Sequence, residues 1–376
     1  MGSSRSSNGP WVLLPVVAAL ILAGLWLWPR SDNQSDSLVV YCAHDQVYAD
    51  EIIREFERQT GIHVDVRYDT EATKSLGLIN LIVQERRHPR CDVFWNNEML
   101  GTLDLHSRDL LEPHQGTAWE RLPEKYRDPQ GYWVGFGARL RVIIVNTTQM
   151  STDQKSIQSA VALDSSRAAI AKPLFGTTLT HYTVLWDAWG PDRLKAWHHE
   201  LRLRGIREVN GNGPVKDVVA GGTCGIGLTD TDDVYVAIDD QLPVDMIPVR
   251  VRIDSEELTT SAVDAVNKPA DDGPSLGFTD ADGTKTICIP NTAAIIRGTK
   301  RLDAARKFVD FLASAETELA LARSKSRQVP LGPVGASQLP PDVSRMKEWA
   351  DDGYDLRPLL PARRACLEWL KSEYLK

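Results

Sequence analysis

The sequence predicts an α/β fold in two parts, preceded by a membrane-spanning helix. Short apolar runs alternate with amphipathic helical patterns from residue 38 to residue 105, and a similar alternation follows residue 142. Residues 11–28 are mostly apolar and carry no charge. Alternating strands and helices are typical of parallel sheets covered by helices, whereas a long uncharged apolar stretch suits a helix that crosses a bilayer.

The N-terminal segment determines the expected compartment. Its apolar part, residues 11–28, approaches the ~20 residues that a helix needs to span a membrane. A cleaved signal peptide has a shorter apolar core that ends in small residues. Here Trp26 and Trp28 occupy that place, and Leu25 stands where a lipoprotein would carry its cysteine. We therefore expect residues 1–37 to be a signal anchor with a polar tether, with the folded part in the periplasm; a cleaved signal peptide is the alternative.

Composition and motifs exclude several classes of protein. The 376 residues carry a net charge of -8 and contain no basic run interleaved with aromatics, which argues against a nucleic-acid partner. None of the five cysteines forms a CxxC pair, and Cys42, Cys91, Cys224 and Cys288 lie beside apolar runs that predict burial. The motifs GxSxG, GxxxxGK[ST] and HExxH are absent, so we expect neither an enzyme nor a tightly bound cofactor.

The first α/β part begins with an apolar strand near residues 38–41. The helix that follows is predicted to end at Gly61, in the position where glycine closes helices. The remaining elements expected here are strands at 62–68 and 92–95 and helices at 76–83 and from Met99 onward.

The second α/β part starts with a strand at residues 142–146. One long amphipathic helix is expected near 181–203, and residues 254–285 are rich in Asp, Ser and Gly and predict a loop. The other expected elements are strands near 206–209, 224–229, 244–249 and 286–296 and helices near 234–238, 302–313 and 359–375.

Several separated blocks, in order, carry a resemblance to a known family. They are LVVYCAHDQVYADEIIREFERQTGIHVDVRYD and CDVFWNNEM, then IAKPLFGTTLTHYTVLWDAWG and VNGNGPVKDVVAGGTCGIGLTDTDD, and last ICIPNTAAIIRGTKRLDAARKFVDFLASAETELALARSKSRQVPLGP. Together they span about residues 38–333. This order resembles bacterial periplasmic solute-binding proteins of the ferric-ion-binding type.

The resemblance implies a two-lobed periplasmic-binding-protein fold of type II that closes on its solute by hinge bending. Lobe 1 would comprise residues 38–137 and 286–335, and lobe 2 residues 138–285 and 336–376. It also implies an ABC-type permease in the inner membrane as the partner, and a monomeric binding protein.

Candidate site residues of the first part follow the ends of predicted strands, where open α/β sheets bind their ligands. His44 and Asp45 can bind a metal or an anion, although Asp45 and Asn97 are equally suited to capping helices. By the resemblance, Asn97 aligns with an acidic metal ligand of the ferric proteins, and Glu98 follows one residue late. The candidates here are His44, Asp45, Glu71, Trp95 and Asn97.

Candidate residues of the second part open predicted helices. Gly176, Thr177, Thr178 and His181 begin one helix and Asn212 begins another. Small and hydroxyl residues at a helix N-terminus leave backbone N–H groups available for an oxyanion. The alternative is that these residues only start ordinary helices.

An acidic run provides the candidates for a cation. The ligand-binding candidates here are Thr229, Asp230, Thr231 and Asp232, and the predicted metal ligands are Asp45, Asp230 and Asp232. Carboxylate oxygens suit a hard cation, but they can equally recognise an amine or simply favour a helix start. By the resemblance, ferric members carry a tyrosine pair about here, where this chain has Thr231 and Asp232, with only Tyr235 nearby.

These observations predict a membrane-tethered solute-binding component of an ABC importer. Its leading solute is ferric iron, carried as cargo and not as a cofactor. A small organic solute, such as a phosphonate or a polyamine, is the alternative within the same fold. A tethered ligand sensor is a further alternative, since binding folds are reused.

Overall fold

A computed structural model describes residues 37–69, 76–153, 165–252 and 283–375. These residues contain a ten-stranded sheet and a separate two-stranded ribbon. The strands of the large sheet are β1 (Leu38–Cys42), β2 (Val64–Tyr68), β3 (Val93–Asn96), β4 (Leu111–Glu112), β5 (Val134–Asn146), β6 (Ala168–Ala171), β7 (Arg207–Val209), β8 (Ile226–Asp230), β9 (Val244–Pro248) and β12 (Cys288–Ile296). The ribbon pairs β10 (Arg250–Arg252) with β11 (Thr284–Thr286).

The sheet has two halves that meet at β5. Its order is β2-β1-β3-β12-β5-β8-β6-β7, with β4 beside β12 and β9 beside β5. Strands β1, β2 and β3 are parallel, as are β6, β7 and β8, whereas β5 and β12 run antiparallel to their neighbours. One part of β5 pairs with β12 and the other with β8 and β9, so this fully buried strand belongs to both halves.

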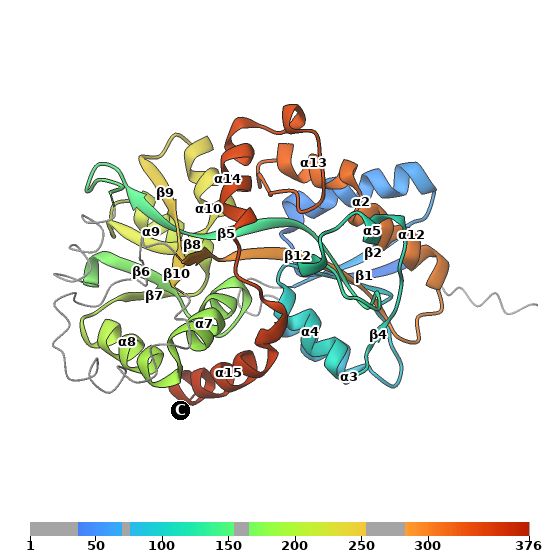
Figure 1. Cartoon of the computed structure of the whole chain (residues 1–376), viewed down its shortest axis with the longest axis horizontal. Helices are drawn as coiled ribbons and strands as arrows, with labels where there is room; N and C mark the ends of the chain where they lie inside the picture. The colour runs from blue at the N-terminus through green and yellow to red at the C-terminus, as the bar shows by residue number, and fades with distance from the viewer. Residues whose placement is uncertain (1–36, 70–75, 154–164, 253–282, 376) are drawn as a thin grey trace, which may run out of the picture. The chain divides into compact units, whose positions relative to one another are not determined.

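Helices cover both faces of the sheet, as Figure 1 shows. One face carries α2 (Gln46–Thr60), α5 (Thr117–Glu120), α9 (Asn212–Ala220), α10 (Thr231–Asp239), α12 (Leu302–Leu312), α13 (Ala315–Arg323) and α14 (Pro341–Asp351). The other carries α3 (Leu76–Gln84), α4 (Met99–Ser107), α7 (Gly176–Trp189), α8 (Pro191–Leu203) and α15 (Leu360–Tyr374). The sheet therefore separates two apolar cores.

Most of the expected elements are confirmed, and the differences have local causes. The helix expected near 181–203 is two helices, because Gly190 adopts a φ of +80° and Pro191 starts α8. The strand expected at 286–296 is divided at Ile287 between β11 and β12. Helix α14 was not expected, and most of the expected loop at 254–285 lies outside the described residues.

Helix α2 illustrates how the sequence sets the local structure. Gly61 ends the helix as predicted, with a φ of +70° and its N–H donating to the Glu57 carbonyl at 2.8 Å. The buried face of the helix presents Phe56, whose ring meets Phe308 of α12 edge-on at 4.8 Å between centroids. Such a pair adds about 0.5–1.5 kcal/mol beyond the burial of its surface.

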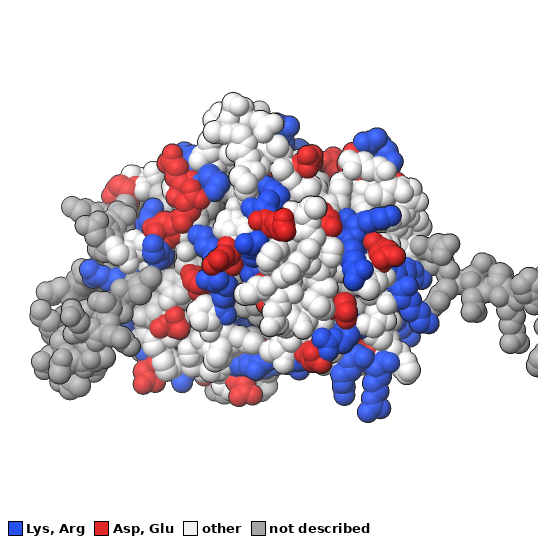
Figure 2. Space-filling model, turned by 45° about the vertical axis from the view of Figure 1, so that its right-hand side comes forward, with Lys and Arg blue, Asp and Glu red and all other residues white. Residues whose placement is uncertain are grey.

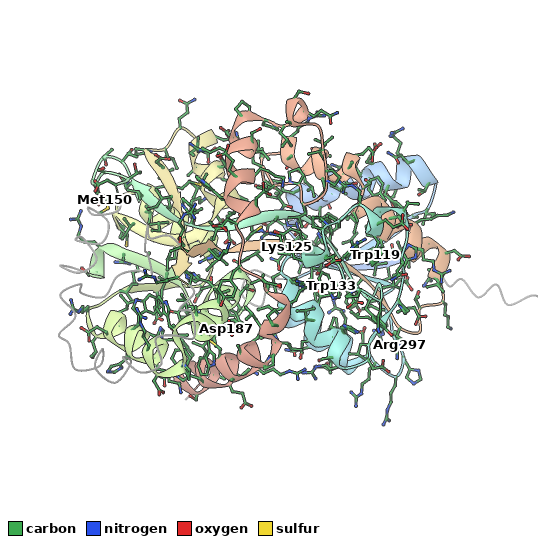
Figure 3. The ribbon with its side chains drawn as sticks, in the orientation of Figure 1. Trp119, Lys125, Trp133, Met150, Asp187 and Arg297 are labelled. Carbon is green, nitrogen blue, oxygen red and sulfur yellow. The ribbon has the colours of Figure 1, made fainter. Side chains whose placement is uncertain are left out.

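The C-terminal helices contact both halves. Helix α15 packs against α4 and α7, and Tyr354 donates a hydrogen bond to Asp187 of α7 at 2.6 Å. Lys125, which lies near the middle of Figure 3, donates to the Asp351 carbonyl at 3.2 Å. The assignment of residues 336–376 to the second lobe therefore stays a prediction.

The remaining expectations concern cysteines and membrane contact. All five cysteines are buried, including the four for which burial was predicted, and none of them forms a disulfide within the described residues. In the part of the chain that the structure describes, no helix is long and apolar enough to span a bilayer; the anchor expected at residues 11–28 lies outside that part. Basic and acidic side chains are interspersed on the face drawn in Figure 2.

Candidate functional site

A pocket that is open to solvent lies where the two halves of the sheet meet. The first half contributes Asp45 and Asn97, the shared strand β5 contributes Arg139, and the second half contributes the remaining lining. That remaining set is Ala171, Lys172, Phe175, Gly176, Thr177, Thr178, Gly211, Asn212, Asp230, Asp232 and Asp233.

Four helices begin at this pocket. Their N-cap residues are Asp45 for α2, Phe175 for α7, Gly211 for α9 and Asp230 for α10. Phe175 and Gly211 have no side-chain acceptor, and neither aspartate caps its own helix by a side-chain hydrogen bond within the described residues. The N-terminus of a helix carries partial positive charge and leaves backbone N–H groups unpaired within the helix. The pocket therefore offers several donors to a negatively charged group.

Asp230 is held by a buried network on one side of the pocket. Its Oδ1 accepts a hydrogen bond from Arg141 Nη1 at 2.8 Å. Its Oδ2 accepts from Thr177 Oγ1 at 2.6 Å and from Asn212 Nδ2 at 2.9 Å. Three donors therefore occupy both oxygens of a carboxylate that is 2% exposed.

The same network fixes the residues that open α7 and α9. Asn212 Oδ1 accepts from Thr178 Oγ1 and from Arg141 Nη1, each at 3.1 Å. Arg141 itself is fully buried, and its Nε and Nη2 have no hydrogen-bond partner among the described residues. Arg141 thus neutralises Asp230 from behind the pocket and positions both helix starts without lining the pocket.

Arg139 reaches the pocket from the same face of β5 as Arg141. Its Nη1 lies 3.6 Å from Asp232 Oδ2, and its Nη2 donates to Asn291 Oδ1 and His44 Nδ1, each at 3.2 Å. Burial opposes the charge of this guanidinium, but the surrounding carboxylates, Asp232 foremost, raise its pKa. Arg139 therefore stays charged while it is 2% exposed.

Carboxylates gather at the start of α10. One oxygen from each of Asp230, Asp232 and Asp233 lies within 4.8 Å of the others. Asp233 Oδ2 accepts a hydrogen bond from Thr229 Oγ1 at 2.8 Å. Tyr48 of α2 lies nearby, and burial together with Asp232 and the other pocket carboxylates raises its pKa. This side of the pocket suits a hydroxyl, an amine or a hard cation.

The arrangement of a pocket between two sheet halves agrees with the family comparison. Residues 38–324, more than half of the chain, match the family described as bacterial extracellular solute-binding protein. The chain is a member of this family. The predicted resemblance to the ferric-ion-binding type is confirmed by the relatives that follow.

Three relatives illustrate the similarity of this solute-binding protein to known proteins. Iron uptake protein A1 of Synechocystis sp. is 21% identical over 336 residues, which cover 88% of this chain and 85% of that protein. Iron-bound HitA from Pseudomonas aeruginosa superposes with a TM-score of 0.70 at 18% identity, covering 89% of this chain and 98% of HitA. AfuA from Actinobacillus pleuropneumoniae, with fructose 6-phosphate bound, superposes at 0.68 with 17% identity, covering 90% and 98%. These structures show that the fold is the two-lobed one predicted.

The structure of this solute-binding protein brings together only part of the predicted site. The predicted residues that line the pocket are Asp45, Asn97, Gly176, Thr177, Thr178, Asn212, Asp230 and Asp232. Those that are buried elsewhere are His44, Trp95, His181, Thr229 and Thr231. Glu71 lies outside the described residues. Of the predicted metal ligands, Asp45 lines the pocket but does not belong to the carboxylate cluster.

The histidines show why some predicted residues miss the pocket. His44 stacks on Trp95 with ring centroids 5.5 Å apart, and its Nδ1 and Nε2 face Arg139 and Gln328. His181 is fully buried, its ring nitrogens have no partner among the described residues, and burial lowers its pKa well below the usual value. Neither imidazole is presented to a solute in this conformation.

Sequence reasoning missed the cationic residues of the site. Arg139 and Arg141 are two residues apart in the run ARLRVIIVN, so a strand places both on one face. Arginine in an otherwise apolar strand is a usable signal, because buried charges are nearly always paired. Lys172 and Asp233 also line the pocket.

Proposed function

We propose that this chain is the membrane-tethered, extracytoplasmic solute-binding component of an ABC-type importer, and that its solute occupies the pocket between the two halves of the sheet. Family membership and the two-lobed fold support the transport role. The apolar stretch at residues 11–28 supports the tether. A tether keeps the receptor near its permease, which reduces the need for very tight binding.

For the solute, the geometry favours a small organic molecule that carries an oxyanion together with hydroxyl or amino groups. The observation that carries this proposal is the convergence of the α7, α9 and α10 N-termini on one pocket that also contains Arg139 and Lys172. Helix N-termini and cationic side chains are the usual partners of phosphate and carboxylate groups. Asp45 and Asp233 supply acceptors for hydroxyls or an amine on the same molecule.

Ferric iron is the second candidate. The close carboxylates at the start of α10 favour it, and the relatives include an iron uptake protein and iron-bound HitA. An ion at Asp230 would compete with the three donors that this carboxylate already accepts. The pocket geometry therefore ranks iron below an oxyanion-bearing solute.

A thermal-shift panel on the full-length chain tests the two candidates together. The compounds are fructose 6-phosphate, 2-aminoethylphosphonate, spermidine, ferric citrate and citrate alone. A solute present at about a hundred times its Kd stabilises the folded state by about 2.7 kcal/mol. We expect at least one phosphorus compound to raise the melting temperature and spermidine to have no effect. A rise with ferric citrate that citrate alone does not give, together with no response to the phosphorus compounds, would reverse the ranking.

A further inference from the structure

A buried cluster of four polar side chains lies where the chain passes between the halves of the sheet. It comprises Arg139 on β5, Asn291 on β12, Gln328 in the segment after α13, and His44 after β1. All four are at most 2% exposed. We call this set the crossover cluster.

The crossover cluster sits on an irregularity in the shared strand. The pairing of β5 with β12 shifts register between Pro290 and Asn291, and Gly137 is the extra residue on the opposite side, with a φ of +46°. Asn291 Nδ2 donates to the Gly137 carbonyl at 2.7 Å and to Gln328 Oε1 at 2.6 Å. Val329 and Ala138 exchange backbone hydrogen bonds of 2.7 and 2.8 Å. A bulge bends a strand locally, so these bonds fix the bend between the halves.

Arg139 belongs both to this cluster and to the pocket. Its Nη2 bonds Asn291 and His44, whereas its Nη1 lies 3.6 Å from Asp232 at the start of α10. A guanidinium is planar and rigid, so a displacement of Nη1 also moves Nη2. Arg139 is therefore a side chain through which Asp232 in the pocket is connected to Asn291 at the bulge.

We propose that Arg139 is a positioning residue that couples occupancy of the pocket to the bend in β5. A solute group can displace Asp232 from Arg139 Nη1 or bind Nη1 beside Asp232. Either change shifts the guanidinium, and therefore alters the hydrogen bond from Arg139 Nη2 to Asn291 and the bend at Gly137. The use of this coupling for solute capture rests on the proposed function, but the coupling itself does not require the solute to be known.

A double-mutant cycle without any solute tests this coupling. The pocket change is Asp232→Asn and the cluster change is Asn291→Ser, each made alone and together in the full-length chain. The readout is hydrogen exchange of the amides at residues 136–140, measured by mass spectrometry. We expect Asp232→Asn to change this exchange rate roughly threefold or more, and the two changes to be non-additive, as for residues in one network.

Two comparisons separate coupling from a general loss of structure. In the Arg139→Lys background, which keeps the charge but loses the planar fork, the two changes should become additive. Asp233→Asn, on the same helical turn, should leave exchange at residues 136–140 unchanged. If Asn291→Ser does not fold, Gln328→Met takes its place in the cycle. Non-additivity that persists in the Arg139→Lys background, or an equal effect of Asp233→Asn, would overturn the proposal whatever the outcome of the solute panel.

Discussion

Arg141 donates a 2.8 Å hydrogen bond to Asp230, and both side chains are almost completely buried. The pair joins the middle of β5 to the end of β8, and through Thr177 and Asn212 it also fixes the first residues of α7 and α9. The walls of the pocket therefore depend on an ion pair that lies behind them.

Replacing Arg141 by methionine should destabilise the protein strongly. The change leaves the Asp230 carboxylate buried without its cation, and breaking a buried ion pair from one side costs about 3–5 kcal/mol. Urea unfolding followed by tryptophan fluorescence measures the loss. The matched control is Arg58→Met, because Arg58 and Glu55 form an exposed pair whose loss should cost far less than that of the buried pair. Equal losses for the two variants would contradict the role given to Arg141.

Gly137→Ala should be more costly than Gly61→Ala, although both glycines have positive φ. At Gly61 a Cβ meets nothing within 4 Å, so only backbone strain of about 1 kcal/mol is expected. At Gly137 a Cβ would lie 2.9 Å from Gln328 Oε1 and 3.1 Å from Leu321 Cδ1, so crowding in the core adds about 1–3 kcal/mol. Chemical denaturation of the two variants compares these costs, and a Gly61 variant that is the less stable of the two would contradict this account.

Stability should fall in acid partly because of His198. This imidazole is buried between Tyr182 and Tyr374, and burial foremost lowers its pKa to about 4. Between about pH 6.5 and pH 4 the unfolded chain binds a proton that the native state does not, so the free energy of unfolding decreases as pH falls, by up to about 3 kcal/mol.

The measurement is urea unfolding at several pH values for the wild-type chain and for His198→Asn. The variant should lose part of the slope between about pH 6.5 and pH 4. A His198→Asn variant with the full wild-type slope would disprove the assignment.

Lys172→Gln should weaken solute binding without affecting the fold. Lys172 lines the pocket beside the start of α7. Loss of its charge-assisted hydrogen bond to an oxyanion should raise the Kd of the solute about tenfold. Isothermal titration calorimetry with fructose 6-phosphate and 2-aminoethylphosphonate measures the change. Lys300→Gln, a substitution of an exposed lysine between β12 and α12, is the control and should bind as the wild type does. Unchanged affinity in Lys172→Gln would remove this lysine from the site.

The fold could be predicted from the sequence largely because the spacing at which apolar residues recur differs clearly between strands and helices. Gly61 and the acidic start of α10 are local signals, since their effects act within a few residues. The break at Gly190 and Pro191 was equally local and was overlooked. The pocket was harder to predict, because side chains such as Arg139 and Asn212 meet only after distant strands pair. His44 and His181 have the chemistry of ligands, but tertiary packing buries them away from the pocket.

A crystal structure grown with whichever compound most raises the melting temperature tests the central claim most directly. The account predicts an oxyanion within hydrogen-bond distance of the backbone N–H groups of Thr177 and Thr178 and of Lys172, with the bond between Arg141 and Asp230 retained. An iron ion coordinated by Asp230, Asp232 and Asp233, with Arg141 displaced, would contradict it.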